Sequence, residues 1–141
     1  MQSPGQSPGL LDNRYPFKNL LGFRMTAFET GRACFEMELG EKHTNPGGVP
    51  HGGVYAALLD SALGSAGCFI ATGVAMHPAV TLNLNVSFLA LARGPLLIAE
   101  GRMTGGGTRV FFAEGEVRDE SGQCVATGTG TFRYLGTKQA D

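Results

Sequence analysis

Asp60 is the residue whose type and surroundings point most directly to chemistry. It lies in a proline-free run rich in alanine and leucine that predicts a helix, and it falls outside the apolar sector of that helix. Two of its neighbours along the helix, Gly64 and Gly67, have no side chain, although a glycine inside a helix costs about 1 kcal/mol relative to alanine. The pattern indicates that a ligand or a second chain approaches the carboxylate. The alternative is a solvent-facing aspartate on an ordinary amphipathic helix.

His51-Gly52-Gly53 marks the start of the same predicted helix. Backbone N–H groups at a helix N-terminus have no partner within the helix and lie at the positive end of its dipole. Because the two glycines have no side chains, these N–H groups would be bare and open to an anion, or to a carbonyl oxygen that gains negative charge during a reaction. A tight turn that merely requires glycine is the alternative explanation.

The spacing between these two features argues against a site built by one chain. Gly53 lies seven residues before Asp60, so at about 1.5 Å per residue the two are about 10 Å apart along the helix. One carbonyl carbon could not easily contact both. Two helices that pack antiparallel across a twofold axis would bring Gly53 of one chain beside Asp60 of the other and give two composite sites per dimer.

Nucleophilic and metal-based chemistry have less support in the sequence. His51 could act as a general base for Ser61 or Cys68, but neither of these residues stands at the sharp strand-to-helix turn of a GxSxG nucleophile. His43, His51 and His77 show neither HxxxH nor HExxH spacing, so no metal site is predicted.

The elements that must position these residues follow from hydrophobic periodicity. Alternating apolar and polar residues predict strands, and segments rich in glycine and proline predict the turns between them. The elements expected are a short helical turn over 15–21, strands over 22–29 and 32–39, one long helix over 53–72, and strands over 80–88, 96–104, 108–119 and 123–135. Thr81 is expected on the polar face of its strand. This order predicts an α+β fold with one long helix packed on a curved antiparallel sheet of about six strands.

Length and composition restrict the class of protein. The chain has 141 residues, of which 43% are hydrophobic and 16% charged, and its formal net charge is −1. These values predict one globular domain over 10–137 after a disordered tail over 1–9, with no basic surface for nucleic acid and no membrane span. The N-terminus lacks the profile of a signal peptide and the three cysteines are widely spaced, so reduced thiols and a cytoplasmic location are expected.

One motif goes beyond these general features. The segment Asn45-Pro46-Gly47-Gly48-Val49-Pro50-His51-Gly52-Gly53, followed by Leu58-Leu59-Asp60-Ser61-Ala62, resembles the signature of hotdog-fold acyl-CoA thioesterases. The resemblance is to the PaaI-type (phenylacetate-degradation) branch of the 4-hydroxybenzoyl-CoA thioesterase superfamily. It covers nearly all of residues 20–135, because the predicted order of strands and helix also matches. It implies the hotdog fold, in which the sheet wraps the helix, and hydrolysis of an acyl-CoA to a carboxylate and CoA.

The resemblance also implies a role for each residue of the motif. Asp60 would be the general base for a water or the nucleophile on the thioester, and the N–H of Gly53 from the other subunit would hold the carbonyl oxygen. His51 and Asn45 would position the thioester and shape the loop. Thr81, where family members often carry Ser or Thr, would orient the water. Family enzymes are homodimers, often paired into homotetramers, and need neither a metal nor a cofactor.

The two ends of the substrate are less well defined. The glycine-rich turn that contains Gly107, Thr108 and Arg109 could cradle a phosphate of the CoA moiety, and Arg93 is a further candidate; an ordinary glycine-rich hairpin is the alternative. The acyl group is expected to be aryl or medium-chain. Its pocket has five candidate lining residues, Tyr55, Met76, Phe88, Phe111 and Phe112; the alternative is that the apolar strand residues belong to the core.

Two other functions are compatible with the same fold. A hotdog dehydratase or hydratase would act on a β-hydroxyacyl thioester, but such enzymes pair a catalytic histidine with an acid in a motif that this sequence lacks. A non-catalytic, regulatory acyl-CoA-binding dimer would not need the combination of Asn45, Gly53 and Asp60.

Overall fold

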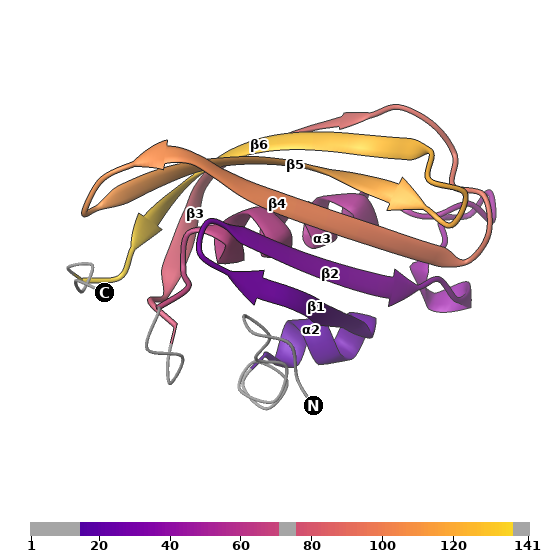
Figure 1. Cartoon of the computed structure of the whole chain (residues 1–141). Helices are drawn as coiled ribbons and strands as arrows, with labels where there is room; N and C mark the ends of the chain where they lie inside the picture. The colour runs from indigo at the N-terminus through magenta and orange to yellow at the C-terminus, as the bar shows by residue number, and fades with distance from the viewer. Residues whose placement is uncertain (1–14, 71–75, 137–141) are drawn as a thin grey trace.

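The structure is a computed structural model that describes residues 15–70 and 76–136 (Figure 1). The tail expected over 1–9 and the domain limits expected at 10 and 137 lie outside the described residues.

The described elements confirm an α+β fold with one long helix and a six-stranded antiparallel sheet. In chain order they are α2 (Pro16–Leu21), β1 (Phe23–Glu29), β2 (Arg32–Glu38), the 3-10 turn η1 (Glu41–His43), α3 (Gly52–Ala66), β3 (Ala79–Phe88), β4 (Leu96–Gly106), β5 (Val110–Asp119) and β6 (Cys124–Tyr134). The strands lie in the order β1-β2-β4-β5-β6-β3. The strand that follows the helix is therefore at the edge of the sheet, next to the last strand.

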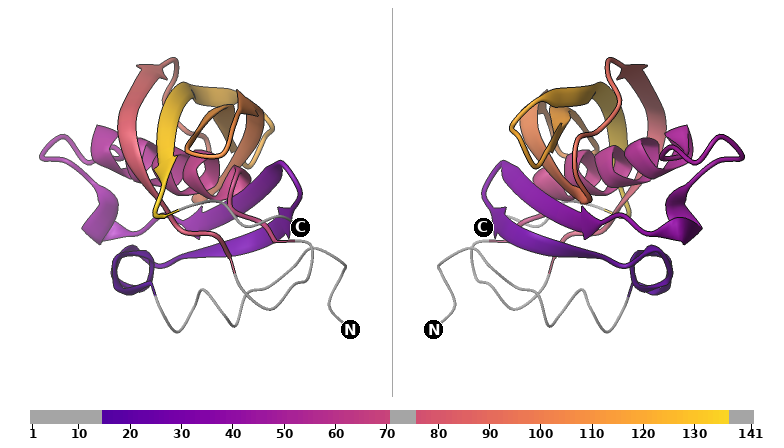
Figure 2. Two further views of the ribbon diagram at one scale, coloured as in Figure 1. Left: turned by 90° about the vertical axis from the view of Figure 1, so that its left-hand side faces the viewer. Right: turned by 90° about the vertical axis from the view of Figure 1, so that its right-hand side faces the viewer.

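The sheet wraps around α3, as both side views in Figure 2 show. The contact is close because two strand glycines lie under the helix: a Cβ on Gly101 would collide with the carbonyl of Ala62, and one on Gly115 would lie 2.8 Å from Leu63. Leu58 and Leu59 are fully buried in this contact. The arrangement expected for the hotdog fold is thus confirmed, with glycines in the sheet as well as small residues in the helix allowing the close approach.

The helix is shorter than the prediction of 53–72: it begins at Gly52 and ends at Ala66. Gly67 follows, and a Cβ on it would lie 2.5 Å from the ring of Phe111. After Gly67 the chain leaves the helical path, and the carbonyl of Cys68 accepts a hydrogen bond from the N–H of His77. The prediction is therefore wrong for 67–70, because packing against the sheet overrides helix propensity there; its last residues, 71 and 72, lie outside the described residues.

A β-bulge changes the facing of side chains in β3. Thr81 pairs with Phe132 of β6, but Asn83 already pairs with Thr131, so Leu82 is an extra residue in β3. The unbroken alternation expected over 80–88 is therefore wrong. Thr81 has its side chain on the same side of the sheet as its buried partner Phe132, toward α3, and not on the outer face.

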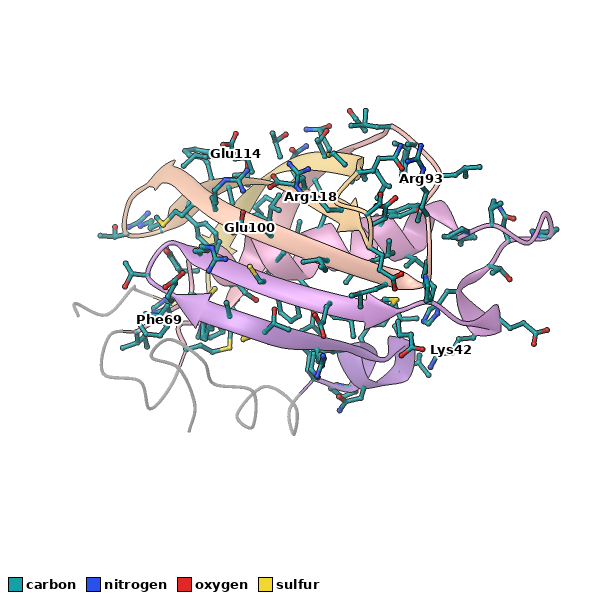
Figure 3. All side chains as sticks on the ribbon, turned by 45° about the vertical axis from the view of Figure 1, so that its right-hand side comes forward. Lys42, Phe69, Arg93, Glu100, Glu114 and Arg118 are labelled. Carbon is teal, nitrogen blue, oxygen red and sulfur yellow. The ribbon has the colours of Figure 1, made fainter. Side chains whose placement is uncertain are left out.

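The outer face of the sheet carries a row of ion pairs. Arg32 binds Glu29 and Glu100, and Arg102 binds Glu100 and Glu116. Figure 3 shows side chains of this face, with Glu100, Glu114 and Arg118 labelled. A hollow of about 280 Å³ lies beside Arg102 and Glu116. The basic group in that hollow is already paired, so the hollow does not indicate a ligand.

Among the described residues, no helix is long and apolar enough to cross a membrane.

Candidate active site

Asp60 lies near the middle of α3, with its carboxylate toward β3. Its Oδ1 accepts a hydrogen bond of 2.6 Å from the hydroxyl of Thr81. The packing of α3 in the curved sheet and the bulge at Leu82 bring the two side chains together. A threonine hydroxyl has one proton, and since Thr81 donates it in the hydrogen bond to Asp60, the Thr81 oxygen can only accept further hydrogen bonds. The pair offers a carboxylate and a hydroxyl acceptor side by side, an arrangement that can hold and deprotonate a water.

A pocket of about 240 Å³ opens beside this pair. It follows α3 from Asp60 to Ser65, about 7.5 Å at 1.5 Å per residue, and reaches Cys68 just after the end of the helix. Its lining residues are Tyr15, Asp60, Ser61, Gly64, Ser65, Cys68, Met76, Ala79, Thr81 and Phe132. At about 30 Å³ for each water-sized group, the pocket holds roughly eight non-hydrogen atoms.

The sequence identifies part of this lining. Asp60, Thr81 and Met76 are predicted and do line the pocket. Gly64 lines it as well, so one of the two helix glycines borders an open space as expected. Gly67 does not: it packs against the core ring of Phe111.

Four of the five predicted aromatic and apolar lining residues lie elsewhere in this chain. Phe111 and Tyr55 are buried in the core, and Phe112 is exposed. Phe88 is exposed at the end of β3, beside Gly52. Sequence reasoning could not separate core positions from pocket positions, because both require apolar residues.

Tyr15 is the lining residue that the sequence gives least reason to expect. It lies before the first strand, outside any periodic segment, yet its hydroxyl is 2.6 Å from the hydroxyl of Ser61 on α3. Burial raises the pKa of Tyr15, and although its hydrogen bond to Ser61 lowers it, the nearby charge of Asp60 raises it further. The phenol therefore remains protonated at neutral pH.

The N–H of Gly53 at the N-terminus of α3 is not bare, as the sequence predicts, but has a hydrogen-bond partner. His51 is the N-cap residue, and its Nδ1 accepts a hydrogen bond of 2.8 Å from the N–H of Gly53. The expectation of a bare N–H at Gly53 is therefore wrong for the isolated chain, because the side chain of His51 satisfies it in the manner of other N-cap side chains. His51 is exposed, so its ring can turn away without disturbing the core.

Asn45 shapes the loop that leads to α3. Its Oδ1 accepts hydrogen bonds from the N–H groups of Gly47 and Val49, and its own N–H donates to the carbonyl of Val49. The loop-shaping part of its expected role is visible. Contact of Asn45 and His51 with a thioester remains a prediction.

The arrangement does not support serine or cysteine catalysis within one chain. The hydroxyl of Ser61 pairs with Tyr15, and the thiol of Cys68 donates to the carbonyl of Gly64. His51 precedes Ser61 by ten residues, about 15 Å along the helix. In the part of the chain that the structure describes, no group of three His, Cys, Asp or Glu side chains could hold a metal ion.

The residues predicted for the CoA moiety lie at two ends of one strand. Arg93 precedes β4, whereas Gly107, Thr108 and Arg109 follow it. The 11 residues of β4 span about 36 Å at 3.3 Å per residue. One chain does not bring the two groups together. Arg93 is labelled in Figure 3, and its backbone N–H donates to Asp119.

Comparison with known proteins agrees with this geometry. The model of the thioesterase superfamily matches residues 47–126. A protein named "Putative esterase PA0474" from Pseudomonas aeruginosa is 37% identical over 98 residues, which are 68% of this chain and 70% of that protein. A protein named "Putative esterase VNG_1336C" from Halobacterium salinarum is 33% identical over 126 residues, 83% of each chain.

Solved structures share the whole architecture. The conserved protein PA5202 from Pseudomonas aeruginosa superposes with a TM-score of 0.77 at 26% identity, over 91% of this chain and all of that one. The PaaI protein of the E. coli phenylacetic acid degradation operon gives a TM-score of 0.79 over 92% of this chain and 91% of its own, and at 19% identity it shows the fold alone. With a family match over more than half of its residues, this chain belongs to the thioesterase superfamily and is a thioester hydrolase with the hotdog fold of the PaaI type.

Proposed function

We propose that this protein hydrolyses acyl-CoA thioesters at two composite sites of a homodimer. The observation that carries the proposal is the hydrogen bond between Thr81 and Asp60 at the edge of the 240 Å³ pocket. The acyl group would occupy the pocket along α3, and its thioester carbon would lie beside the carboxylate. An aryl or medium-chain acyl group fits the available volume.

The reaction needs a base or nucleophile and a donor for the carbonyl oxygen. Asp60 would take a proton from a water that also donates to the Thr81 oxygen, and the resulting hydroxide would attack the thioester carbon. The carbon–sulfur bond then breaks, CoA leaves as the thiol with the proton that Asp60 held, and the acyl group leaves as the carboxylic acid, which loses its proton to solvent to give the carboxylate. Alternatively the Asp60 carboxylate attacks first and water cleaves the anhydride. Both routes use only water, so no cofactor is proposed.

A second copy of the chain would supply the oxyanion donor. Gly53 is about 10 Å from Asp60 along α3, and β3 pairs on one side only, with β6. The free edge of β3 exposes Leu82 and Phe88, each 57% exposed. Pairing of this edge across a twofold axis would cover it and bring the partner subunit's helix N-terminus toward Asp60. We also propose that two such dimers pair into a homotetramer through the outer faces of their sheets.

The N–H of Gly53 must be free when the substrate oxygen arrives. In the isolated chain it donates to His51. We expect the exposed ring of His51 to turn away, or to share the N–H with the carbonyl oxygen, when the thioester binds. One oxyanion donor contributes roughly 2.7–4 kcal/mol in the transition state, where the oxygen carries negative charge, and this exceeds the net value of about 0.5–1.5 kcal/mol for the neutral cap bond that it replaces.

The CoA moiety would contact both subunits. Arg93 and the turn containing Gly107, Thr108 and Arg109 lie about 36 Å apart in one chain. In a twofold dimer, β4 of the partner subunit can run opposite to β4 of the first subunit. Arg93 of one subunit and the glycine-rich turn of the other can then lie beside the same CoA nucleotide. All three cysteines are free thiols, which supports a reducing, cytoplasmic location.

Release of free CoA thiol from a panel of aryl, short-chain and medium-chain acyl-CoAs tests the activity, and light scattering tests the dimer. A sharper test uses complementation. Asp60→Asn and Gly53→Pro are each expected to be inactive as homodimers, because one lacks the base and the other the N–H. After co-expression, about a quarter of the sites combine an intact Asp60 with an intact Gly53, since half of the dimers are mixed and half of their sites are intact.

Recovery of about a quarter of wild-type turnover would support the composite site. No recovery in verified mixed dimers would place both groups in one chain and contradict it. Consumption of enoyl-CoA without thiol release would instead indicate a hydratase. Binding of acyl-CoA without either reaction would indicate a regulatory protein.

A further inference from the structure

His43 is a buried side chain that the proposed reaction does not use. It is the last residue of η1 and is 2% exposed. Its Nδ1 lies 2.8 Å from the backbone nitrogen of Gly40, and its Nε2 lies 2.6 Å from the carbonyl oxygen of Leu21 in α2. Because an amide N–H only donates and a carbonyl only accepts, these partners assign the ring proton to Nε2. Both ring nitrogens are satisfied, and the ring joins the η1 turn to the end of α2.

The bond to Leu21 anchors the η1 turn to a fixed part of the chain. α2 is itself held against the core, since Lys18 is 2% exposed and its Nζ donates to the carbonyl of Phe23 in β1. The segment on the other side of the bond has fewer buried contacts. His43 is the one buried residue in 38–53, a stretch that the structure describes in full. The position of this stretch therefore depends mainly on the His43 ring.

The backbone of His43 extends this anchor to the start of α3. Its carbonyl oxygen accepts a hydrogen bond of 2.8 Å from the N–H of His51, the N-cap residue of α3. Thr44 and Pro50 form an antiparallel bridge within the same loop. Gly53, whose N–H is the proposed oxyanion donor, is two residues beyond His51. A displacement of His43 is therefore transmitted through His51 to the turn that presents this N–H.

We infer that His43 is a positioning residue for hydrolysis: its buried imidazole holds the loop before α3 against α2 and thereby fixes the N–H of Gly53 where it meets the thioester oxygen. The inference rests on the proposed function, because it requires Gly53 to supply the oxyanion donor. Such a donor acts from a position fixed in advance, and a misplacement of about 1 Å can cost about 10²-fold in rate. CoA and the acyl group bind elsewhere, so loss of the His43 anchor should lower kcat and leave KM nearly unchanged.

His43→Asn removes the anchor with little change elsewhere. Its amide oxygen can accept from the N–H of Gly40 in place of Nδ1, but the side chain is too short to reach the carbonyl of Leu21. Thiol release is expected to show a kcat about tenfold lower than that of the wild type and a KM within about twofold of it. Lys42→Gln is the matched control. Lys42, labelled in Figure 3, also bonds α2, at the carbonyl of Leu20, but it is exposed, so this variant should keep both constants.

Co-expression separates positioning from a general loss of structure. Since His43 acts on Gly53 of its own chain, His43→Asn should fail in the same half of the composite site as Gly53→Pro. Paired with Asp60→Asn, it should recover about a quarter of wild-type turnover, because about a quarter of the sites combine its intact Asp60 with the intact helix N-terminus of the other chain. Paired with Gly53→Pro, it should recover only about a twentieth, because about half of the sites work at about a tenth of the wild-type rate.

A kcat of His43→Asn equal to that of the wild type, or equally low recovery in the two pairings, would overturn the inference. His43→Gln is the second variant if His43→Asn does not fold. It keeps a donor for Leu21 but no acceptor for Gly40, and it must likewise recover more turnover with Asp60→Asn than with Gly53→Pro. No recovery when Asp60→Asn is paired with Gly53→Pro would instead overturn the proposed composite site, and the inference with it.

Discussion

The hydroxyl of Thr81 reaches the carboxylate of Asp60 because β3 contains one residue more than its partner strand needs. Leu82 is that residue. Without it the alternation would place Thr81 on the outer face of the sheet, and with it the side chain of Thr81 points toward α3. Strand bulges often occur beside active sites, where they redirect a single side chain. Here the bulge places a hydroxyl on the candidate base.

Asp60→Asn should abolish most turnover while the fold persists. The amide cannot accept a proton from water, and general-base assistance contributes about 10²- to 10⁴-fold. Thr81→Ala should reduce kcat by a smaller factor, roughly tenfold, because it removes one hydrogen bond. Thiol release and thermal melting measure the two effects, and Thr81→Ser, which keeps the hydroxyl, is the control. Hydrolysis by Asp60→Asn at the wild-type rate would exclude Asp60 from the reaction.

The bulge also predicts how two valines of β3 differ. Val80 precedes the bulge and faces outward, whereas Val86 follows it and packs against the core. Val80→Thr should change the free energy of unfolding by no more than about 0.5 kcal/mol, and Val86→Thr should cost about 1–2 kcal/mol through burial of its hydroxyl. Urea denaturation of the two isosteric variants measures this difference. Equal losses would mean that both valines share one face and that the alternation has no break.

The sequence predicts the order of the elements because the segments 32–39 and 80–88 alternate clearly, turn residues separate the other strands, and the helix has an apolar sector without proline. It cannot predict the bulge, since the residues from Val80 to Phe88 alternate without a break and the extra residue shows only in the pairing with β6. The motif residues Asp60 and Thr81 are likewise predictable. Tyr15 is not, because only the tertiary structure brings it to Ser61.

The end of α3 also depends on a tertiary contact that the sequence alone does not reveal. Gly67 is the C-cap residue of α3, a local stop signal that the prediction of 53–72 does not use, and the ring of Phe111 occupies the space that a side chain at position 67 would need. That contact joins a helix and a distant strand, and no local pattern encodes it. His51 is a similar case: its capping of Gly53 depends on a side-chain rotamer rather than on residue type.

Gly67→Ala should destabilise the fold. Its Cβ would lie 2.5 Å from the Phe111 ring, and overpacking of this kind costs about 1–3 kcal/mol. Gly64→Ala is the matched control: its Cβ would lie 3.2 Å from the edge of Phe132, on the pocket wall, and alanine favours the helix by about 1 kcal/mol. Gly64→Ala should therefore retain stability and raise KM by narrowing the pocket. Equal stability of both variants would contradict the assigned contact with Phe111.

Asp119 should make stability depend on acid pH. Its carboxylate accepts hydrogen bonds from the hydroxyl and N–H of Ser121 and from the N–H groups of Gln123 and Arg93. The hydroxyl bond from Ser121 is the main cause that lowers the pKa of Asp119, and the backbone bonds lower it further although burial opposes them. A pKa lowered on folding adds stability above the unfolded value near 3.8, and this contribution is lost as the pH falls through the folded value.

Asp119→Asn should accordingly unfold at lower urea than the wild type at pH 7. With its amide oxygen in the place of Oδ1, its NH2 group stands in the place of Oδ2 and cannot accept from the N–H of Arg93. The difference between the two urea midpoints should narrow as the pH falls toward 3, where the wild-type carboxylate takes up its proton and weakens the same bonds. Glu114→Gln, at an exposed position of β5, is the control and should follow the wild type at both pH values. A gap between Asp119→Asn and wild type that stays constant from pH 7 to pH 3 would show that the ionised carboxylate does not hold this turn.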